Sequence, residues 1–375
     1  MKGPNVLHFI EFSLPGGAES LVLDLCLLQR AAGLNPMIAH FNHPHFNKRC
    51  QELAIPSFEL PARAQFKKTA TLPLFALGLA RRLRQSGIAL LHSHLFGPIV
   101  GGSIASFLAR TPHVGTLHDI HMIEEDPTRI RQLQACLLLG TRLVAVSRHT
   151  REFYAGRVRF RSDRITCIHN GVRLKRSTPV TRQSLGIENG LVAIMVGRLV
   201  PLKRVHDAID ALYALRAQHR IRLLVVGGGP ELPALQSHVD RLGMKSLVNF
   251  LGERGDVAEL LAISDLFLQC SETEGLSMAI IEALHAGLPC IVSKVGGNPE
   301  LVRSGENGFL FEAGNVDALV QNLRALAAEP RLLVEFGMRS KELAARQFTA
   351  ESCASSYLDV YEQMGLKRQP MQAGH

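Results

Sequence analysis

Two carboxylates in the second half of the chain are spaced so that both could bind hydroxyl groups at the two ends of one long ligand. Glu274 stands beside Gly275 at a predicted loop-to-helix junction, and Glu282 follows eight residues later. Along a helix that rises ~1.5 Å per residue, this spacing separates the two groups by about 12 Å. The paired carboxylates of glycoside hydrolases need about 5–5.5 Å or about 6.5–9.5 Å, so this pair does not fit that chemistry. An ion pair or a capping role would explain Glu282 equally well.

Two cations and two glycines follow apolar runs earlier in the same half. Arg198 and Lys203 flank a loop, and a guanidinium fork beside an ammonium suits the charge of a diphosphate. A pair of solvated surface cations would give the same pattern. Gly227 and Gly228 open another loop, where glycine lets the backbone approach a nucleotide closely. No Gly-Lys-Ser or Gly-Lys-Thr follows, which excludes the signature of a P-loop ATPase.

Backbone amides at two predicted helix starts are further candidates. The N–H groups of Gly275, Leu276 and Ser277 would point at a bound, oxygen-rich group. Gly16 and Gly17 follow the first apolar run and open a helix, where an N–H can approach an anion. A plain tight turn explains this pair as well, because the six-residue GxGxxG fingerprint is absent.

Three histidines lie at the ends of predicted strands in the first half. His118 follows the predicted strand 113–117, at the edge where parallel sheets bind ligands, and its position fits a ligand role as well as a structural one. His92 and His94 are two residues apart, so they share one side of any strand that includes both. A metal bound by this pair is expected to have no third ligand nearby. We therefore predict no metal site and no cofactor.

Short apolar runs alternate with longer helical periods along the whole chain, which predicts βαβ units and parallel sheets. The predicted strands are 6–10, 35–40, 89–93, 113–117, 143–147, 165–169, 191–196, 221–226, 248–251, 265–269 and 289–292. The clearest helices are 18–32, 72–85, 204–218 and 231–242. A polar stretch with a proline, 173–179, separates the two series. The prediction is an α/β protein with two Rossmann-like, doubly wound domains, 1–175 and 176–353, facing each other across a cleft.

Positive charge is concentrated in the first half of this 375-residue chain. The net charge is +9, and residues 1–175 carry 22 basic against 11 acidic side chains. Such a half suits nucleic acid, an anionic membrane surface or an anionic substrate. The absence of Trp and the presence of only four Tyr disfavour nucleic-acid binding by base stacking. The missing GxGxxG disfavours a dinucleotide-dependent oxidoreductase.

The seven cysteines include no CxxC pair, which predicts reduced thiols rather than disulfides or a zinc site. The sequence has no run of 18 apolar residues and no secretory signal pattern. We therefore expect a cytoplasmic protein.

In their order along the chain, these motifs resemble those of the retaining glycosyltransferase family 4, whose members have the GT-B fold. The markers are GG at 16–17, HSH at 92–94, TLH at 116–118, AVS at 145–147, NGV at 170–172, GR at 197–198, Lys203, GGGP at 227–230, Glu274 with Glu282, GLP at 287–289 and GG at 296–297. Two positions depart from the family pattern. Ala89 stands where an acidic residue is frequent, and Arg173 stands where an Asp is usual.

The resemblance implies a donor site in the second domain. Arg198 and Lys203 would hold the donor's diphosphate, and Glu282 would bind the ribose hydroxyls. Glu274 would hold hydroxyls of the transferred sugar, together with the amides of Gly275, Leu276, Ser277 and Met278.

The resemblance also implies roles for the first domain. Gly17 would supply an amide near the diphosphate or the acceptor, and His118 would contact the donor sugar near the reaction centre. The last helix, at about 354–375, would cross back onto this domain.

The function implied is transfer of a sugar from a nucleotide-sugar donor, with a UDP-sugar favoured over GDP-mannose, to a saccharide or lipid-linked glycan. The reaction would retain the anomeric configuration and would need no metal, because no DxD-like motif follows a strand. Surface polysaccharide, exopolysaccharide or lipopolysaccharide synthesis would be the setting. A sugar-nucleotide epimerase or a phosphorylase of GT-B architecture is the alternative enzyme. A basic nucleic-acid-binding protein is the alternative without catalysis.

The helix 72–85 suggests that the first domain docks on the anionic inner face of the plasma membrane. Lys67 and Lys68 precede it. Its apolar residues near one face are Leu72, Phe75, Leu79 and Leu83, and its basic end holds Arg81, Arg82 and Arg84. An amphipathic helix with a basic end can lie in a membrane interface. The alternative interpretation is that this apolar face packs inside the protein, because every helix of a βαβ unit needs one buried apolar face.

Overall fold

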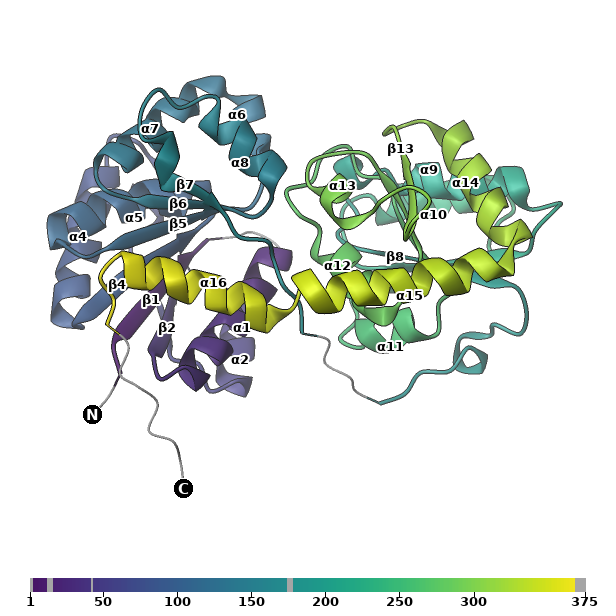
Figure 1. Ribbon diagram of the computed structural model, residues 1–375, viewed down its shortest axis with the longest axis horizontal. Coiled ribbons are helices and arrows are strands. Elements are labelled where there is room, and N and C mark those ends of the chain that lie inside the picture. The colour runs from purple at the N-terminus through teal and green to yellow at the C-terminus, as the bar shows by residue number, and fades with distance from the viewer. Residues whose placement is uncertain (1–2, 12–15, 42, 174–177, 368–375) are drawn as a thin grey trace. The chain divides into compact units, whose positions relative to one another are not determined.

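The structure is a computed structural model that describes residues 3–11, 16–41, 43–173 and 178–367. The chain divides into two compact units, Met1–Gly171 with Ala350–His375, and Val172–Thr349. In each unit helices pack on a central β-sheet (Figure 1). The predicted domain boundary between 175 and 176 lies outside the described residues, as do residues 368–375 of the predicted last helix.

The first unit contains a sheet of seven parallel strands in the order β3-β2-β1-β4-β5-β6-β7. Their bounds are Asn5–Ile10 (β1), Asn35–His40 (β2), Ser57–Glu59 (β3), Ile88–His94 (β4), His113–Leu117 (β5), Arg142–Ala145 (β6) and Ile165–Cys167 (β7). The central strands β1, β4 and β5 are buried along nearly their whole length. Burial on both faces explains why such strands read as continuous apolar runs.

The second unit contains a sheet of six parallel strands in the order β10-β9-β8-β11-β12-β13. Their bounds are Leu191–Val196 (β8), Ile221–Val226 (β9), Val248–Gly252 (β10), Leu266–Gln269 (β11), Cys290–Ser293 (β12) and Gly308–Phe311 (β13). In both sheets the strand order reverses beside the first strand of the unit, between β1 and β4 and between β8 and β11.

Helices follow most of these strands. In the first unit they are α1 (Gly17–Ala31), α2 (Pro44–Glu52), α3 (Arg63–Lys67), α4 (Leu72–Gln85), α5 (Phe96–Ala109), α6 (His121–Glu125), α7 (Ile130–Leu138), α8 (Arg148–Ala155) and α16 (Ala350–Gln363). In the second they are α9 (Val205–Leu215), α10 (Leu232–Arg241), α11 (Val257–Ala262), α12 (Met278–Ala286), α13 (Asn298–Leu301), α14 (Val316–Ala328) and α15 (Pro330–Gln347). Within the described ranges, none of them has the length and apolar character needed to span a membrane.

The predicted α/β class with two doubly wound sheets is confirmed, with differences at the sheet edges. The strands β3 and β13 were not predicted, since one has three residues and the other begins with a glycine. The predicted strand 143–147 ends at Ala145, because Ser147 caps α8 and its hydroxyl accepts the N–H of Thr150 at 3.0 Å. The predicted strand 165–169 ends at Cys167.

The helix α4 has its predicted bounds, but its predicted membrane face is part of the protein core. Phe75, Leu79 and Leu83 are 5%, 3% and 0% exposed, and Leu72 packs against the same cluster. The exposed leucines of α4 are instead Leu74 and Leu77, at 62% and 39%. The need of a βαβ unit for one buried helix face therefore explains the pattern 72-75-79-83.

We predict that Leu83→Ala lowers the free energy of unfolding by ~2–5 kcal/mol, because it removes a fully buried side chain and leaves a cavity. Leu77→Ala, the matched control on the exposed face of the same helix, should change it by less than ~0.5 kcal/mol. Urea unfolding of both variants measures the difference. Equal effects would contradict the assignment of the buried face.

Candidate functional site

In the second unit the reversal of strand order brings two loops of predicted site residues together. The loop after β8 carries Arg198 and Lys203, and the loop after β11 carries Glu274. Because β8 and β11 are adjacent parallel strands, both loops leave the same edge of the sheet. Crevices that bind ligands form at such points, where successive crossovers run in opposite directions.

Lys203 and Glu274 meet across this point as a direct ion pair. Their side chains are 23% and 11% exposed, and the same carboxylate oxygen accepts the hydroxyl of Ser271 at 2.7 Å. The backbone N–H of Glu272 donates to the carbonyl of Leu202 at 2.8 Å. The two loops are thus fixed to each other before any ligand binds.

Arg198 lines the same pocket as Gly197, Lys203 and Gln269. It is exposed, and within the described ranges its guanidinium makes no hydrogen bond or ion pair. Gln269 donates its amide N–H to the hydroxyl of Ser277 at 3.0 Å, while its buried Oε1 accepts no hydrogen bond from any residue that the structure describes. Sequence reasoning missed Gln269 and Ser271, although a polar residue ending the apolar strand 266–269 was a usable signal for Gln269.

The predicted glycines after β9 pack against the loop after β8. Gly227 has φ +131, and a Cβ there would lie 2.0 Å from the carbonyl oxygen of Gly197. Gly228 accepts the N–H of Leu199 at 2.8 Å through its own carbonyl. Close approach of the two loops therefore requires glycine at 227. A nucleotide contact by Gly227 and Gly228 remains a prediction.

The start of α12 corrects the geometry expected for Glu274 and Glu282. The helix begins at Met278, with Ser277 as its N-cap, so Glu274 lies in the loop and the helical spacing does not apply to the pair. Glu282 is half-buried on the helix. Gly275 and Leu276 are buried before the cap. Their amides lie in the loop before the N-cap Ser277 rather than in the first turn of the helix, and contact with a ligand remains a prediction.

A tight turn after β12 supports the backbone of Glu274. Gly296 has φ +51, and a Cβ at this position would lie 1.7 Å from the carbonyl oxygen of Glu274. The N–H of Gly297 donates to the carbonyl of Gly275 at 3.0 Å. Gly296 thus has a steric reason to be glycine, because any side chain at this position would displace the Glu274 loop.

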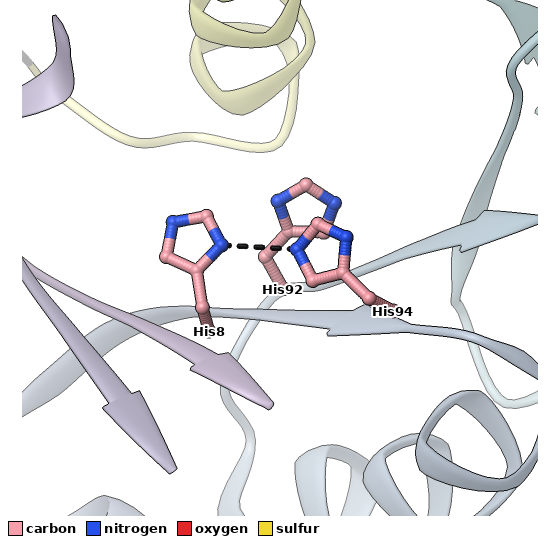
Figure 2. A group of neighbouring side chains, drawn as sticks. All are labelled: His8, His92 and His94. Atoms are coloured by element: carbon pink, nitrogen blue, oxygen red, sulfur yellow. Dashed lines mark hydrogen bonds between the residues drawn. The ribbon is translucent and has the colours of Figure 1, made fainter. Parts of the chain in front are cut away.

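In the first unit, the predicted histidines form part of a buried cluster at the reversal between β1 and β4. His8, on β1, lies beside His92 and His94, on β4 (Figure 2). The expectation that the pair has no neighbouring third histidine was wrong, because His8 pairs in register with His92 from a distant part of the sequence. Ring nitrogens of the three residues lie within 4.8 Å of one another, close enough to hold a metal ion.

Hydrogen bonds already engage the nitrogens of this cluster. His8 Nδ1 lies 3.0 Å from His94 Nε2, and His94 Nδ1 lies 3.3 Å from His118 Nε2. His92 bonds the hydroxyl of Tyr361 at 2.6 Å and that of Thr116 at 2.7 Å. The arrangement fits neutral rings that are joined by hydrogen bonds. A metal ion could bind the ring nitrogens only if these hydrogen bonds were broken.

Burial keeps the rings of the cluster neutral. It lowers the pKa of His8 and of His118 to about 4, and it holds the pKa of His92 and His94 well below the ordinary value. His118 itself is half-buried at the end of β5. A neutral imidazole can donate one hydrogen bond and accept one, which suits contact with a hydroxyl.

The predicted glycines of the first unit lie where the chain enters α1. Gly16 is the N-cap and Gly17 the first residue of this 15-residue helix. Residues 12–15 of the predicted loop lie outside the described residues. A ligand contact by the amide of Gly17 remains a prediction.

Two family models match consecutive parts of the chain. The model described as Glycosyltransferase Family 4 matches residues 15–176, and the model described as Glycosyl transferases group 1 matches residues 177–343.

Individual proteins are similar over most of their length. N-acetyl-alpha-D-glucosaminyl L-malate synthase of Bacillus anthracis is 30% identical over 77% of this chain and 79% of its own. The UDP-Gal:alpha-D-GlcNAc-diphosphoundecaprenol alpha-1,3-galactosyltransferase of Escherichia coli is 28% identical over 66% of this chain and 68% of its own. The crystal structure of Anabaena HepE in complex with UDP and glucose superposes with a TM-score of 0.84 at 25% identity, covering 96% of this chain and 100% of that one.

We predict that the free energy of unfolding falls as the pH drops from 7 to 5.5. His8 and His113 have pKa values lowered by burial to about 4 and about 3, and those of His92 and His94 are lower than usual for the same reason. In the unfolded chain these groups take up protons below about 6.5, whereas the folded state does not. Stability is therefore present above about 6.5 and is lost below it, by roughly 1 kcal/mol per histidine at pH 5.5. Urea unfolding at both pH values measures the loss, and an unchanged free energy would contradict burial of neutral rings.

Proposed function

This chain belongs to the group 1, family-4 glycosyltransferases, and on that premise we propose that it transfers a hexose from a UDP-sugar to a saccharide or lipid-linked glycan. The observation that carries the proposal is the Lys203–Glu274 ion pair at the reversal of strand order, with Arg198 beside it. In this proposal the two cations bind the donor's diphosphate and the carboxylate binds sugar hydroxyls, and all three side chains lie at one edge of one sheet.

Two similarities favour UDP over GDP as the donor nucleotide. The Escherichia coli relative is named for a UDP-galactose donor, and the Anabaena structure contains UDP and glucose. The acceptor proposal draws on the same relative, whose name specifies a diphosphoundecaprenol-linked sugar. Synthesis of a cell-surface polysaccharide or lipopolysaccharide is the setting that we propose.

The proposed chemistry depends on stabilising the leaving group. Departure of the nucleoside diphosphate builds negative charge on its phosphates and positive charge on the sugar. Arg198 and Lys203 neutralise the former, and Glu274 accepts hydroxyl hydrogen bonds from the sugar. Side-chain cations take the place of a metal in this proposal, because the sequence lacks a DxD-like motif after its strands. The acceptor attacks from the leaving-group side, so that the anomeric configuration is retained.

The ion pair at Lys203 and Glu274 also has a consequence for donor binding. Lys203 is held within the crevice by the carboxylate, so little side-chain entropy is lost when a phosphate binds it. Glu282 on α12 and the amide groups before α12 complete the proposed donor site, for the ribose and the transferred sugar respectively.

We predict that Glu274→Ala and Lys203→Ala each lower the rate of sugar transfer from a UDP-sugar by about 10²–10³, the usual cost of removing one group that stabilises developing charge. Matched controls are Glu335→Ala and Lys294→Ala, whose side chains are 48% and 58% exposed. The measurement is a transfer assay with a panel of UDP- and GDP-sugars, with and without EDTA, on variants with equal thermal midpoints. Near-normal rates in both site variants would contradict the donor site, and loss of all activity in EDTA would contradict metal independence.

We further propose that the first unit docks on the anionic inner face of the plasma membrane, where a lipid-linked acceptor would lie. Leu74 and Leu77 are exposed on α4, and Arg81 follows one turn later on the same face. Phe107 and Leu108 are exposed at the end of the neighbouring α5, where Arg84 donates to the carbonyl of Leu108. Exposed apolar side chains beside cations suit an interface with anionic lipid.

We predict that the protein sediments with anionic vesicles at low salt and that Leu74→Ser with Leu77→Ser reduces this binding. Each basic residue near such a surface contributes about 1 kcal/mol, so Lys68→Glu with Arg81→Glu should weaken binding by at least tenfold. The control is Val334→Ser with Met338→Ser, which removes two apolar side chains that are 64% and 63% exposed from α15 in the other unit. Sedimentation that is absent from wild type, or equal in all variants, would contradict docking through α4 and leave a soluble acceptor.

A further inference from the structure

A chain of hydrogen bonds links Gln29, deep in the first unit, to His118 at the edge of its sheet. Gln29 Oε1 lies 2.9 Å from His8 Nε2, His8 Nδ1 lies 3.0 Å from His94 Nε2, and His94 Nδ1 lies 3.3 Å from His118 Nε2. Gln29, His8 and His94 are each 0% exposed. This series of hydrogen bonds therefore runs from α1 through β1 and β4 to the loop after β5, and its first three members are shielded from water.

The direction of every bond in this chain follows from the first one. The amide oxygen of Gln29 can only accept, so His8 must carry its proton on Nε2. A neutral His8 then accepts on Nδ1, which requires His94 to donate from Nε2. By the same step His94 accepts on Nδ1, and His118 donates from Nε2. The Nδ1 of His118 is left as an acceptor.

A second branch fixes the amide of Gln29 from its other side. Gln29 Nε2 donates to the hydroxyl of Tyr361 at 3.0 Å, and this hydroxyl can then donate to His92 Nδ1 at 2.6 Å. His92 in turn donates from Nε2 to Thr116, at 2.7 Å. Tyr361 belongs to α16, so the last helix of the chain completes the network. The rings at 8, 94 and 118 therefore carry the proton on Nε2, and the ring at 92 carries it there when Tyr361 is the donor.

We propose that Gln29, His8 and His94 are positioning residues that hold His118 as its Nε2–H tautomer, so that its Nδ1 accepts a hydrogen bond from a substrate hydroxyl. The identity of the bound hydroxyl rests on the proposed function, whereas the tautomer does not. An imidazole without such partners exchanges between two tautomers and presents a donor for part of the time. Among the described residues no side chain bonds Nδ1 of His118, which is half-buried.

Neutrality of the rings is required for this direction to hold. A protonated His8 or His94 would donate from both nitrogens and reverse every bond beyond it. Burial lowers the pKa of each of these rings far enough that they are neutral at pH 7. Each imidazole in this series of hydrogen bonds therefore carries a single N–H proton.

The first test is the two-bond proton–nitrogen NMR spectrum of the wild-type protein with ¹⁵N-labelled histidine, at pH 7 and without donor. We expect His8, His92, His94 and His118 to be neutral and to carry the proton on Nε2, with signals assigned from single-histidine variants. A proton on Nδ1 of His8, His94 or His118, or a mixed population at His118, would overturn the proposal. So would stoichiometric zinc in the purified protein, since its ligands would lose these bonds.

The second test compares His94→Leu with His113→Leu. His113 is equally buried on β5 but bonds Thr141 and Ser93, outside the chain to His118. We expect His94→Leu to give a mixture of tautomers at His118 and to lower kcat about tenfold, the typical effect of one hydrogen bond. His113→Leu should lower stability without changing the His118 signal. An unchanged single tautomer in His94→Leu would overturn the positioning role.

The two proposals fail in different ways. If the wild-type spectrum shows the expected tautomers and no UDP-sugar is turned over, the hydrogen-bond chain stands and the proposed function falls. If turnover is found while His118 is a mixture, the proposed function stands and the positioning role falls.

Discussion

The reversal of strand order is the constraint on which both groups of candidate residues depend. Parallel strands must be joined by crossovers. Where the crossovers after two adjacent strands run in opposite directions, the loops that follow these strands diverge and leave a crevice at the carboxyl edge of the sheet. This happens between β1 and β4 and again between β8 and β11. Lys203 and Glu274 join the two loops in the second unit, and His8 and His94 face each other across the two strands in the first. Residues far apart in sequence thus meet for a topological reason.

The polar groups at the two reversals of strand order differ in charge and in burial. In the second, the ion pair remains partly exposed at 23% and 11%, so that its charges keep some solvation and can still bind an anion. In the first, His8, His92 and His94 are fully buried and neutral, and each is stabilised by a hydrogen bond to another side chain. One of those partners, Tyr361, comes from α16, and Tyr357 of the same helix bonds the hydroxyl of Thr116. The return of the last helix to the first unit therefore has a chemical consequence as well as a packing one.

Much of this architecture could be predicted from the sequence, because doubly covered strands must be apolar throughout and their boundaries fall at glycine and polar residues. The bounds of β2, β5, β8 and β9 agree with the prediction for that reason. Contacts set by strand register could not be predicted, since nothing local to His8 indicates that it pairs with His92. The buried face of α4 was ambiguous for a related reason: the same period serves a core and a membrane interface, and only packing against α5 and the sheet decides. Gln269 and Ser271 were overlooked because hydrogen bonds, not a motif, bring them to the site.

The central claim is that the crevice around Lys203 and Glu274 binds the donor of the reaction. The most direct measurement is a crystal structure of the protein with an unreactive UDP-sugar analogue. We expect diphosphate oxygens within hydrogen-bond distance, about 3 Å, of Arg198 and Lys203, and a sugar hydroxyl at the same distance from Glu274. A fully occupied analogue whose phosphates contact neither cation would contradict the account.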